Sequence, residues 1–301
     1  MDAFIATVMA NKAIAAAVAA GLVGLYLVWP KRKTAPPKYS DRVVLQMFER
    51  WEKGTASASP GCARAEAFLR LAGVPHDVNK SGKEGPTGRW PYVEHRGKYV
   101  SDSSDIVAYA AALSGKPELL DKNIADPQRR AEALLLSRVC EQSLYFSVVR
   151  YRWVDNIDAL VDAFVLPVPY FAKSLIMRRF IRPEIIKTCD YQGNGARDND
   201  QYRADAVETV QAMIDTLRAN GTLTGSGFFA GRATPGEIDC TLYAYLANAQ
   251  VELAGARPQW PVAALMKKDA ALQAYLKRVA TAIYPDDPKP GRGSVEKWDP
   301  R

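Results

Sequence analysis

An uncharged apolar run near the N-terminus constrains this chain more than any other feature. It extends from Ala13 to Trp29, 17 residues, close to the length that the apolar core of a bilayer requires. Tyr26 and Trp29 stand at its end, where aromatic rings favour the headgroup region, and Pro30 and the basic triplet 31–33 follow. The sequence therefore predicts one N-terminal membrane helix, residues 1–30, with the rest of the chain on the side of Lys31, Arg32 and Lys33.

Two other interpretations of this run stay open, a cleaved signal peptide and a buried core helix. A signal peptide begins with a basic region, whereas this chain has Asp2 there. The residues after the run, Trp-Pro-Lys-Arg-Lys, make a poor cleavage site. We therefore expect a retained anchor, followed by a short Pro-containing linker over residues 31–41.

Small residues recur every fourth position within the predicted anchor. One stripe is Ala16, Ala20 and Gly24, and a second is Ala13, Ala17 and Gly21. Such stripes allow helices in a membrane to approach closely, although Ala-rich segments also produce them by chance. The expected partners are membrane lipid and other membrane-protein subunits.

Composition excludes several classes of site. The net charge is +7 and the pI about 9.1, but no Lys/Arg run is interleaved with aromatic residues, so we expect no nucleic-acid partner. The four cysteines are far apart and form no CxxC, which indicates a reducing compartment without disulfides. With only two histidines, we also expect no metal site.

The first part of the body alternates short apolar runs with capped helices. Ser59 and Pro60 begin a helix that ends at Gly73, and the segment Ser101-Asp102-Ser103-Ser104-Asp105 caps another that runs to Ser114. The expected strands are Val43–Phe48, Pro75–Val78, Trp90–His95 and, after an Arg96-Gly97 turn, Lys98–Val100.

Four motifs in this order resemble the thioredoxin-like domain of glutathione transferases, and are most similar to the failed-axon-connections and metaxin-like branch. They are Ser59-Pro60-Gly61-Cys62, Ala72-Gly73-Val74-Pro75, Pro91-Tyr92-Val93-Glu94-His95-Arg96-Gly97 and Asp102-Ser103-Ser104. The segment from Tyr145 to Asp155 resembles the LYW…RW motif of the same branch. The resemblance implies an α/β thioredoxin-like domain at 42–115, a connector at 116–122 and an all-α domain at 123–284.

The second part of the body is expected to be helical from Asp126 to about Tyr284. Residues 158–180 contain Pro167 and Pro169, which predicts two core helices with a kink. The segment with Gly236 and Asp239 resembles the capped, buried helix of transferases, so these two residues are predicted to be structural. The tail, residues 285–301, is Pro/Gly-rich and is predicted to be irregular.

The resemblance implies a glutathione site at three places. The first is Ser59 at the N-terminus of the first helix, where transferases place a thiolate-binding group. The second is a cis-proline at Trp90-Pro91, which would expose backbone groups to glutathione. The third is Asp102 with Ser103, which would bind the γ-glutamyl end. Ser59 could equally be only a helix cap. Cys62, three residues on, is expected to be buried and inert, and His95 is expected at the surface.

Two hypotheses follow from these observations. In the first, the chain is a non-catalytic accessory or structural subunit of a membrane assembly, as the metaxin-like branch implies, in a mitochondrial membrane such as that of a respiratory-chain complex or the import machinery. In the second, it is an active glutathione transferase that uses Ser59 to activate the thiol. Glutathione is the one cofactor that the resemblance implies.

Overall fold

The computed structural model describes residues 41–51, 56–80, 85–164, 169–285 and 295–298. The predicted anchor, residues 1–30, and the linker as far as residue 40 fall outside these ranges. Within them, no helix combines the length and the apolar character needed to cross a bilayer.

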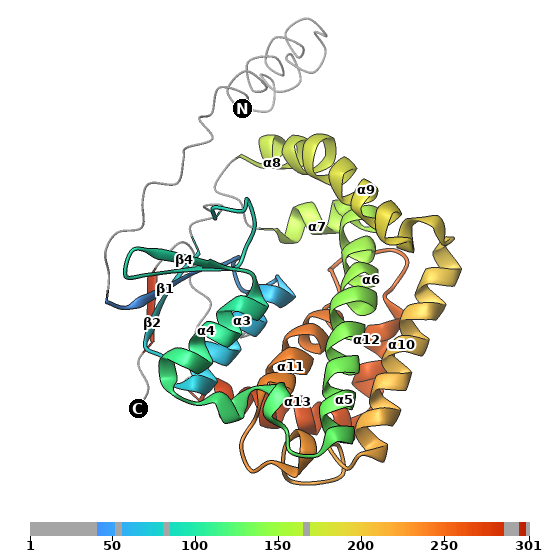
Figure 1. The fold of residues 1–301 in the computed structure, drawn as a ribbon. Helices are drawn as coiled ribbons and strands as arrows, with labels where there is room; N and C mark the ends of the chain where they lie inside the picture. Colours follow the sequence, from blue (N-terminus) through green and yellow to red (C-terminus); the bar gives the residue numbers. More distant parts are fainter. Residues whose placement is uncertain (1–40, 52–55, 81–84, 165–168, 286–294, 299–301) are drawn as a thin grey trace, which may run out of the picture. The chain divides into compact units, whose positions relative to one another are not determined.

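In the described residues, five short strands form one mixed sheet in the order β4-β3-β1-β2-β5 (Figure 1). β1 runs parallel to β2 and antiparallel to β3, which forms a hairpin with β4. The turn of that hairpin is Arg96-Gly97, as predicted, and both residues have positive φ (47° and 73°). The strands are β1 (Val43–Gln46), β2 (His76–Asn79), β3 (Tyr92–His95), β4 (Lys98–Ser101) and β5 (Val295–Trp298).

β5 corrects the prediction of a wholly irregular tail. Val295–Trp298 pairs antiparallel with β2, with Val295 opposite Asn79 and Trp298 opposite His76. Without β5, one side of β2 would present unpaired N–H and C=O groups, which a fifth strand satisfies. The tail sequence is rich in Pro and Gly, so this long-range pairing left no local signal in it.

Two helices pack between the sheet and the helical domain (Figure 1). They are α3 (Pro60–Ala72) and α4 (Ser103–Ser114), and each ends at a glycine in the left-handed region, Gly73 and Gly115. α3 contacts both α4 and α11 (Glu237–Ala249), and it is buried along almost its whole length. The first helix of the thioredoxin-like domain is therefore the main contact between the two domains.

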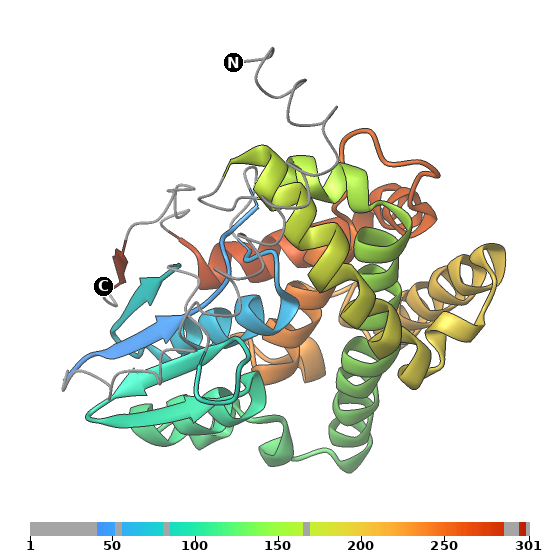
Figure 2. The same ribbon diagram turned by 90° about the horizontal axis from the view of Figure 1, so that it is seen from above.

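The helical domain follows two 3-10 turns, η1 (Pro117–Leu119) and η2 (Asp121–Asn123). α5 and α6 lie in line, as Figures 1 and 2 show, because the π-helical segment η3 joins them without a break. A second π-helical segment, η4, extends α6. The expected break at residues 158–180 is present, with α7 and α8 on either side of it. The elements are α5 (Pro127–Arg138), η3 (Val139–Leu144), α6 (Tyr145–Val149), η4 (Arg150–Asp155), α7 (Ile157–Ala163), α8 (Tyr170–Ile176), η5 (Met177–Ile181), α9 (Arg182–Gln192), η6 (Asn194–Ala196), α10 (Asn199–Ala219), η7 (Phe229–Gly231), α11, α12 (Pro261–Lys268) and α13 (Ala270–Ile283).

Candidate functional site

The N-terminus of α3 carries the first candidate residue, Ser59. Its backbone is extended and its Oγ accepts a hydrogen bond from the Cys62 backbone N–H at 3.5 Å, while Pro60 fills the first helical position. The Ser59 side chain is half-buried. Ser59 is therefore the N-cap of α3.

Cys62 lies in the first turn of α3, fully buried in the core. Burial raises the pKa of its thiol to about 11, although hydrogen bonds from the Ser59 side chain and the Phe48 backbone act in the opposite direction. A thiol with this pKa is almost entirely protonated at neutral pH, so it is a poor nucleophile. All four cysteines are free and buried.

The second candidate pair, Trp90 and Pro91, directly precedes β3. Their peptide bond is cis, as the resemblance implied. The Pro91 carbonyl accepts a hydrogen bond from the Asp102 backbone N–H at 3.3 Å. The Trp90 ring packs against Phe48 with ring centroids 4.5 Å apart. This segment is therefore tied both to the start of α4 and to the end of β1.

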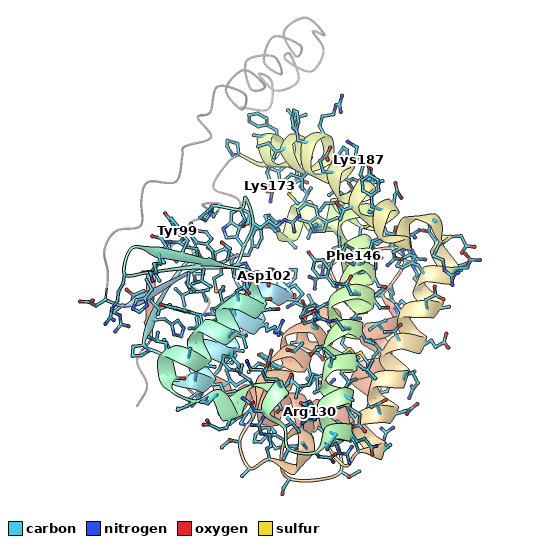
Figure 3. All side chains as sticks on the ribbon, viewed as in Figure 1. Tyr99, Asp102, Arg130, Phe146, Lys173 and Lys187 are labelled. Carbon is cyan, nitrogen blue, oxygen red and sulfur yellow. The ribbon has the colours of Figure 1, made fainter. Side chains whose placement is uncertain are left out.

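The third candidate pair is Asp102 and Ser103 at the N-terminus of α4. Asp102 is exposed and has φ 80°, in the left-handed half of backbone space that non-glycine residues seldom adopt. Its Oδ1 accepts from the Ser104 backbone N–H at 2.9 Å, and Figure 3 labels it at the start of α4. Ser103 is buried. A residue held in such a conformation is often part of a binding site.

Gly61 shows that these three segments converge. A Cβ built on Gly61 would lie 3.6 Å from Pro91 Cδ and 3.8 Å from Ser103 Oγ. The structure thus brings together the start of α3, the cis-proline and the start of α4, as the resemblance implied. Gly61, Pro91 and Ser103 therefore lie together, two residues along the chain from Ser59.

Two residues of the helical domain hold the loop that leads to Ser59, and sequence reasoning did not single them out for this role. The buried Arg152 donates to the Ala58 carbonyl at 3.3 Å, and the buried Asn248 donates to the Ser57 carbonyl at 3.0 Å. The Arg152 guanidinium also lies over the Trp51 ring, 4.7 Å from its centroid. Arg152 belongs to the predicted branch motif, whereas no sequence signal marks Asn248.

A second buried cation, Arg64 of α3, connects the domains at another point. It donates to Ser104 Oγ at 3.1 Å, to Glu141 at 2.8 Å and to Glu237 at 2.9 Å. Because these partners come from α4, η3 and α11, one guanidinium joins three elements. Through Arg64, the start of α4 is thus connected to the helical domain.

Two hollows lie near the candidate residues, and neither is lined by Ser59 or Cys62. The larger, about 760 Å³ and open to solvent, lies beside Arg89, Trp90, Tyr99, Asp102 and Asp105. The smaller, about 390 Å³, lies at the other end of the sheet and includes His95.

His95 corrects the expectation of a surface histidine. It is 4% exposed, with Nδ1 2.6 Å from the Tyr109 hydroxyl and Nε2 3.1 Å from the Asp41 carbonyl. The ring is buried because it packs against Tyr109 of α4, with ring centroids 5.9 Å apart. In the described ranges, no three His, Cys, Asp or Glu side chains gather as a metal site would require.

Asp239 is buried at the start of α11. Its Oδ2 accepts from the Gly236 N–H at 2.8 Å, and its Oδ1 accepts from the Phe229 N–H at 3.0 Å and the Tyr275 hydroxyl at 2.6 Å. The carboxylate thus joins the preceding turn to α11 and α13, in keeping with the structural role predicted for Asp239. The Arg232 guanidinium lies where a Cβ of residue 236 would stand, so a larger residue at this cap would have to displace the end of that side chain.

Comparison with known proteins agrees with this architecture. Residues 60–157 match the family described as glutathione S-transferase N-terminal domain. Glutathione transferase GSTFuA3 from Phanerochaete chrysosporium is similar over 80% of this chain and 97% of its own, with 11% identity and a TM-score of 0.52. The glutathione S-transferase CsGST63524 of Ceriporiopsis subvermispora, solved in complex with glutathione, is similar over the same shares, with 13% identity and a TM-score of 0.50. The body therefore has a glutathione-transferase-like fold.

Proposed function

We propose that the chain is a non-catalytic accessory subunit of a membrane assembly, in which the transferase-like body provides protein contacts. The observation that carries this proposal is the state of the two groups at the start of α3. The Cys62 thiol is buried with its pKa raised to about 11, and Ser59 Oγ caps the helix. Neither group is a poised nucleophile.

The surroundings of Ser59 support the same proposal. The buried Arg152 and Asn248 of the helical domain donate hydrogen bonds to the loop that precedes Ser59. This loop therefore forms part of the contact between the two domains. Phe48 at the end of β1 lies between Trp90 and Phe164, with ring centroids 4.5 and 6.4 Å away. Aromatic packing of this kind stabilises a fixed structure, whereas a conjugating enzyme needs space for a second substrate beside the thiol.

The membrane part of the proposal comes from the sequence. The run Ala13–Trp29 is the proposed anchor, the stripe Ala16, Ala20 and Gly24 is the proposed helix-packing surface, and the flank Lys31–Lys33 sets the side of the body. The resemblance to the metaxin-like branch suggests a mitochondrial membrane. We propose a respiratory-chain complex or the import machinery as the kind of assembly.

Purification of the full chain in a mild detergent tests this proposal. We expect stoichiometric partner subunits to co-purify, and we expect the Ala16→Leu/Ala20→Leu/Gly24→Leu variant to lose them while remaining in the membrane fraction. The control Ala15→Leu/Ala19→Leu carries similar bulk on another side of the predicted helix and is expected to keep them. Migration of the wild-type chain only as a monomer would overturn the proposal.

A second function, an active glutathione transferase, is favoured by one observation. Pro91 and Ser103 converge beside Gly61, and Asp102 has the strained backbone of a binding residue. The Ser59 hydroxyl could then donate to the thiolate of glutathione, with the partial positive charge of the α3 N-terminus assisting.

Titration with glutathione and a conjugation assay with a chlorodinitrobenzene decide between the two functions. The informative variant is Ser59→Gly, because glycine keeps most of the capping preference but removes the hydroxyl. If the transferase is active, Ser59→Gly abolishes conjugation with little change in stability. If millimolar glutathione does not bind, this second function is excluded and the accessory role stands.

A further inference from the structure

The helical segment α8–η5–α9, residues 170–192, has an unusual exposed side. Three aromatic side chains are largely open to solvent, Tyr170 (57% exposed), Phe171 (59%) and Tyr191 (90%). The sequence predicted helical core for residues 158–180, which is wrong for Tyr170 and Phe171. Exposed tyrosine and phenylalanine beside basic residues are typical of surfaces that meet the headgroup region of a bilayer.

The same segment is basic. It contains five Lys/Arg residues and two acidic residues, Glu184 and Asp190, so its net charge is 5 − 2 = +3. The basic residues are Lys173, Arg178, Arg179, Arg182 and Lys187.

Two of these charges have exposed ion-pair partners, and Arg178 pairs with Asp158. Arg179 is exposed and has no ion pair within the part of the chain that the structure describes. Lys187 pairs only with the exposed Glu184, a solvent-screened bond. The segment therefore retains a positive field directed to solvent.

The other side of the segment is packed against the protein. α9 contacts η4 and α6, and η5 contacts α7, while Met177 and Cys189 are buried. In Figures 1 and 2 the segment runs along the outside of the helical domain, and Figure 3 labels Lys173 and Lys187 on it. One side is thus anchored in the fold, while on the other side the printed contacts are exposed ones, Tyr170 with Asp162, Arg178 with Asp158 and Lys187 with Glu184.

We propose that this side docks on an anionic phospholipid surface. We call it the basic aromatic face and define it by Tyr170, Phe171, Arg178, Arg179, Lys187 and Tyr191. The aromatic rings would enter the headgroup region, and the Lys/Arg side chains would pair with lipid phosphates. Charge complementarity selects this occupant, because an uncharged apolar partner would leave the Arg179 charge in an apolar contact without compensation. The proposal is independent of the predicted anchor.

The test uses the full chain in vesicles of phosphatidylcholine, with or without about one third phosphatidylglycerol. A fluorophore is attached at Thr188→Cys, next to Lys187, and quenching by nitroxide-labelled lipid is measured; the four native cysteines are buried and should not compete. The matched control carries the label at the exposed Ala264→Cys on α12. We expect stronger quenching at 188 than at 264, only in anionic vesicles, and weaker quenching at high salt.

Charge variants sharpen the test. Arg179→Gln/Lys187→Gln is expected to weaken docking about 30-fold, since each basic residue near an anionic surface contributes about fivefold. Lys268→Gln/Lys277→Gln removes two exposed lysines elsewhere and is expected to leave the quenching at 188 unchanged.

Four outcomes separate this proposal from the anchor. Equal quenching at 188 and 264 overturns the basic aromatic face, even if the chain sediments with both vesicles and the anchor stands. If the chain does not bind phosphatidylcholine vesicles but its label at 188 is quenched in anionic vesicles, the anchor is absent. The same result supports docking through the basic aromatic face. If neither lipid quenches the label at 188, but the purified assembly shields it from iodide, then protein covers this face. That outcome overturns lipid docking. A label at 188 that neither lipid nor protein covers also overturns it.

Discussion

Arg152 binds Asn248 twice, through Nη1 to the side-chain oxygen at 3.3 Å and through Nη2 to the backbone carbonyl at 2.6 Å. No carboxylate pairs with Arg152 in the residues that the structure describes, and burial lowers the pKa of this guanidinium to about 10. Asn248 Oδ1 also accepts from the Trp51 indole at 3.1 Å. One amide side chain thus satisfies a buried cation, an indole and the loop that precedes Ser59.

Asn248→Ala is therefore expected to be strongly destabilising. It removes an acceptor from the buried Arg152 and the half-buried Trp51, and a donor from the buried Ser57 carbonyl, at a cost of about 2–4 kcal/mol. Urea unfolding measures this loss, and hydrogen exchange at the Ala58 and Ser59 amides should accelerate. Asn123→Ala, at an exposed position, is the control and should change stability by about 0.5 kcal/mol or less. Equal costs for the two variants would contradict the role given to Asn248.

Glu66 of α3 is expected to be the most sensitive carboxylate in the thioredoxin-like domain. Arg50 donates to both of its oxygens, at 2.6 and 2.5 Å, Arg70 donates at 3.0 Å, and all three side chains are buried. Glu66→Gln removes the negative charge that these two buried guanidinium groups share, and breaking a buried ion pair typically costs about 3–5 kcal/mol. Thermal unfolding monitored by circular dichroism measures this loss of stability. Glu184→Gln, in the exposed pair with Lys187, should cost under about 1 kcal/mol; a loss as large as that of Glu66→Gln would count against burial as the cause.

Local sequence signals predicted much of the fold and the place of the candidate site. Ser59-Pro60 and Gly73 mark the two ends of α3 because capping and left-handed termination depend on a few neighbouring residues. The Trp90-Pro91 and Asp102-Ser103 positions follow from equally local motifs, and the structure brings both beside the start of α3. The order of these motifs along the chain was enough to predict the glutathione-transferase-like fold.

Features that depend on contacts distant in sequence could not be predicted in this way. β5 pairs with β2 across more than two hundred residues, and nothing in a four-residue strand specifies that partner. Asn248 lies in an ordinary helical pattern, and its role follows only from the packing of α11 beside the loop before Ser59. Tyr170 and Phe171 have the apolar character of core residues, so their exposure depends on where α8 is placed.

Asp121 predicts a dependence of stability on pH. Burial, and next the neighbouring Glu237, raise the pKa of its carboxyl from 3.8 to about 8. Between these values the folded chain holds a proton that the unfolded chain releases, so this contribution to stability is present below about pH 4 and is lost as the pH rises towards 8. Asp121→Asn keeps an oxygen for the Ile238 N–H, now 3.0 Å from Asp121 Oδ1, and removes the titration.

Melting temperatures of the wild type and Asp121→Asn from pH 4 to pH 9 test this. We expect the two to agree near pH 4 and the variant to become progressively more stable than the wild type up to about pH 8. A constant difference over the whole range would show that Asp121 does not titrate there.

The hydrogen bond between Tyr275 and Asp239 predicts which of two substitutions costs more stability. Tyr275→Phe removes one of three donors to the Asp239 carboxylate, so we expect a loss of about 1–2 kcal/mol. Asp239→Ala leaves the Phe229 and Gly236 N–H groups and the Tyr275 hydroxyl unpartnered together, so we expect at least twice that loss. Because all three bonds converge on one carboxylate, Asp239→Ala/Tyr275→Phe should be little worse than Asp239→Ala alone. Urea unfolding of the three variants measures the coupling, and additive losses would mean that Tyr275 stabilises α13 independently of Asp239.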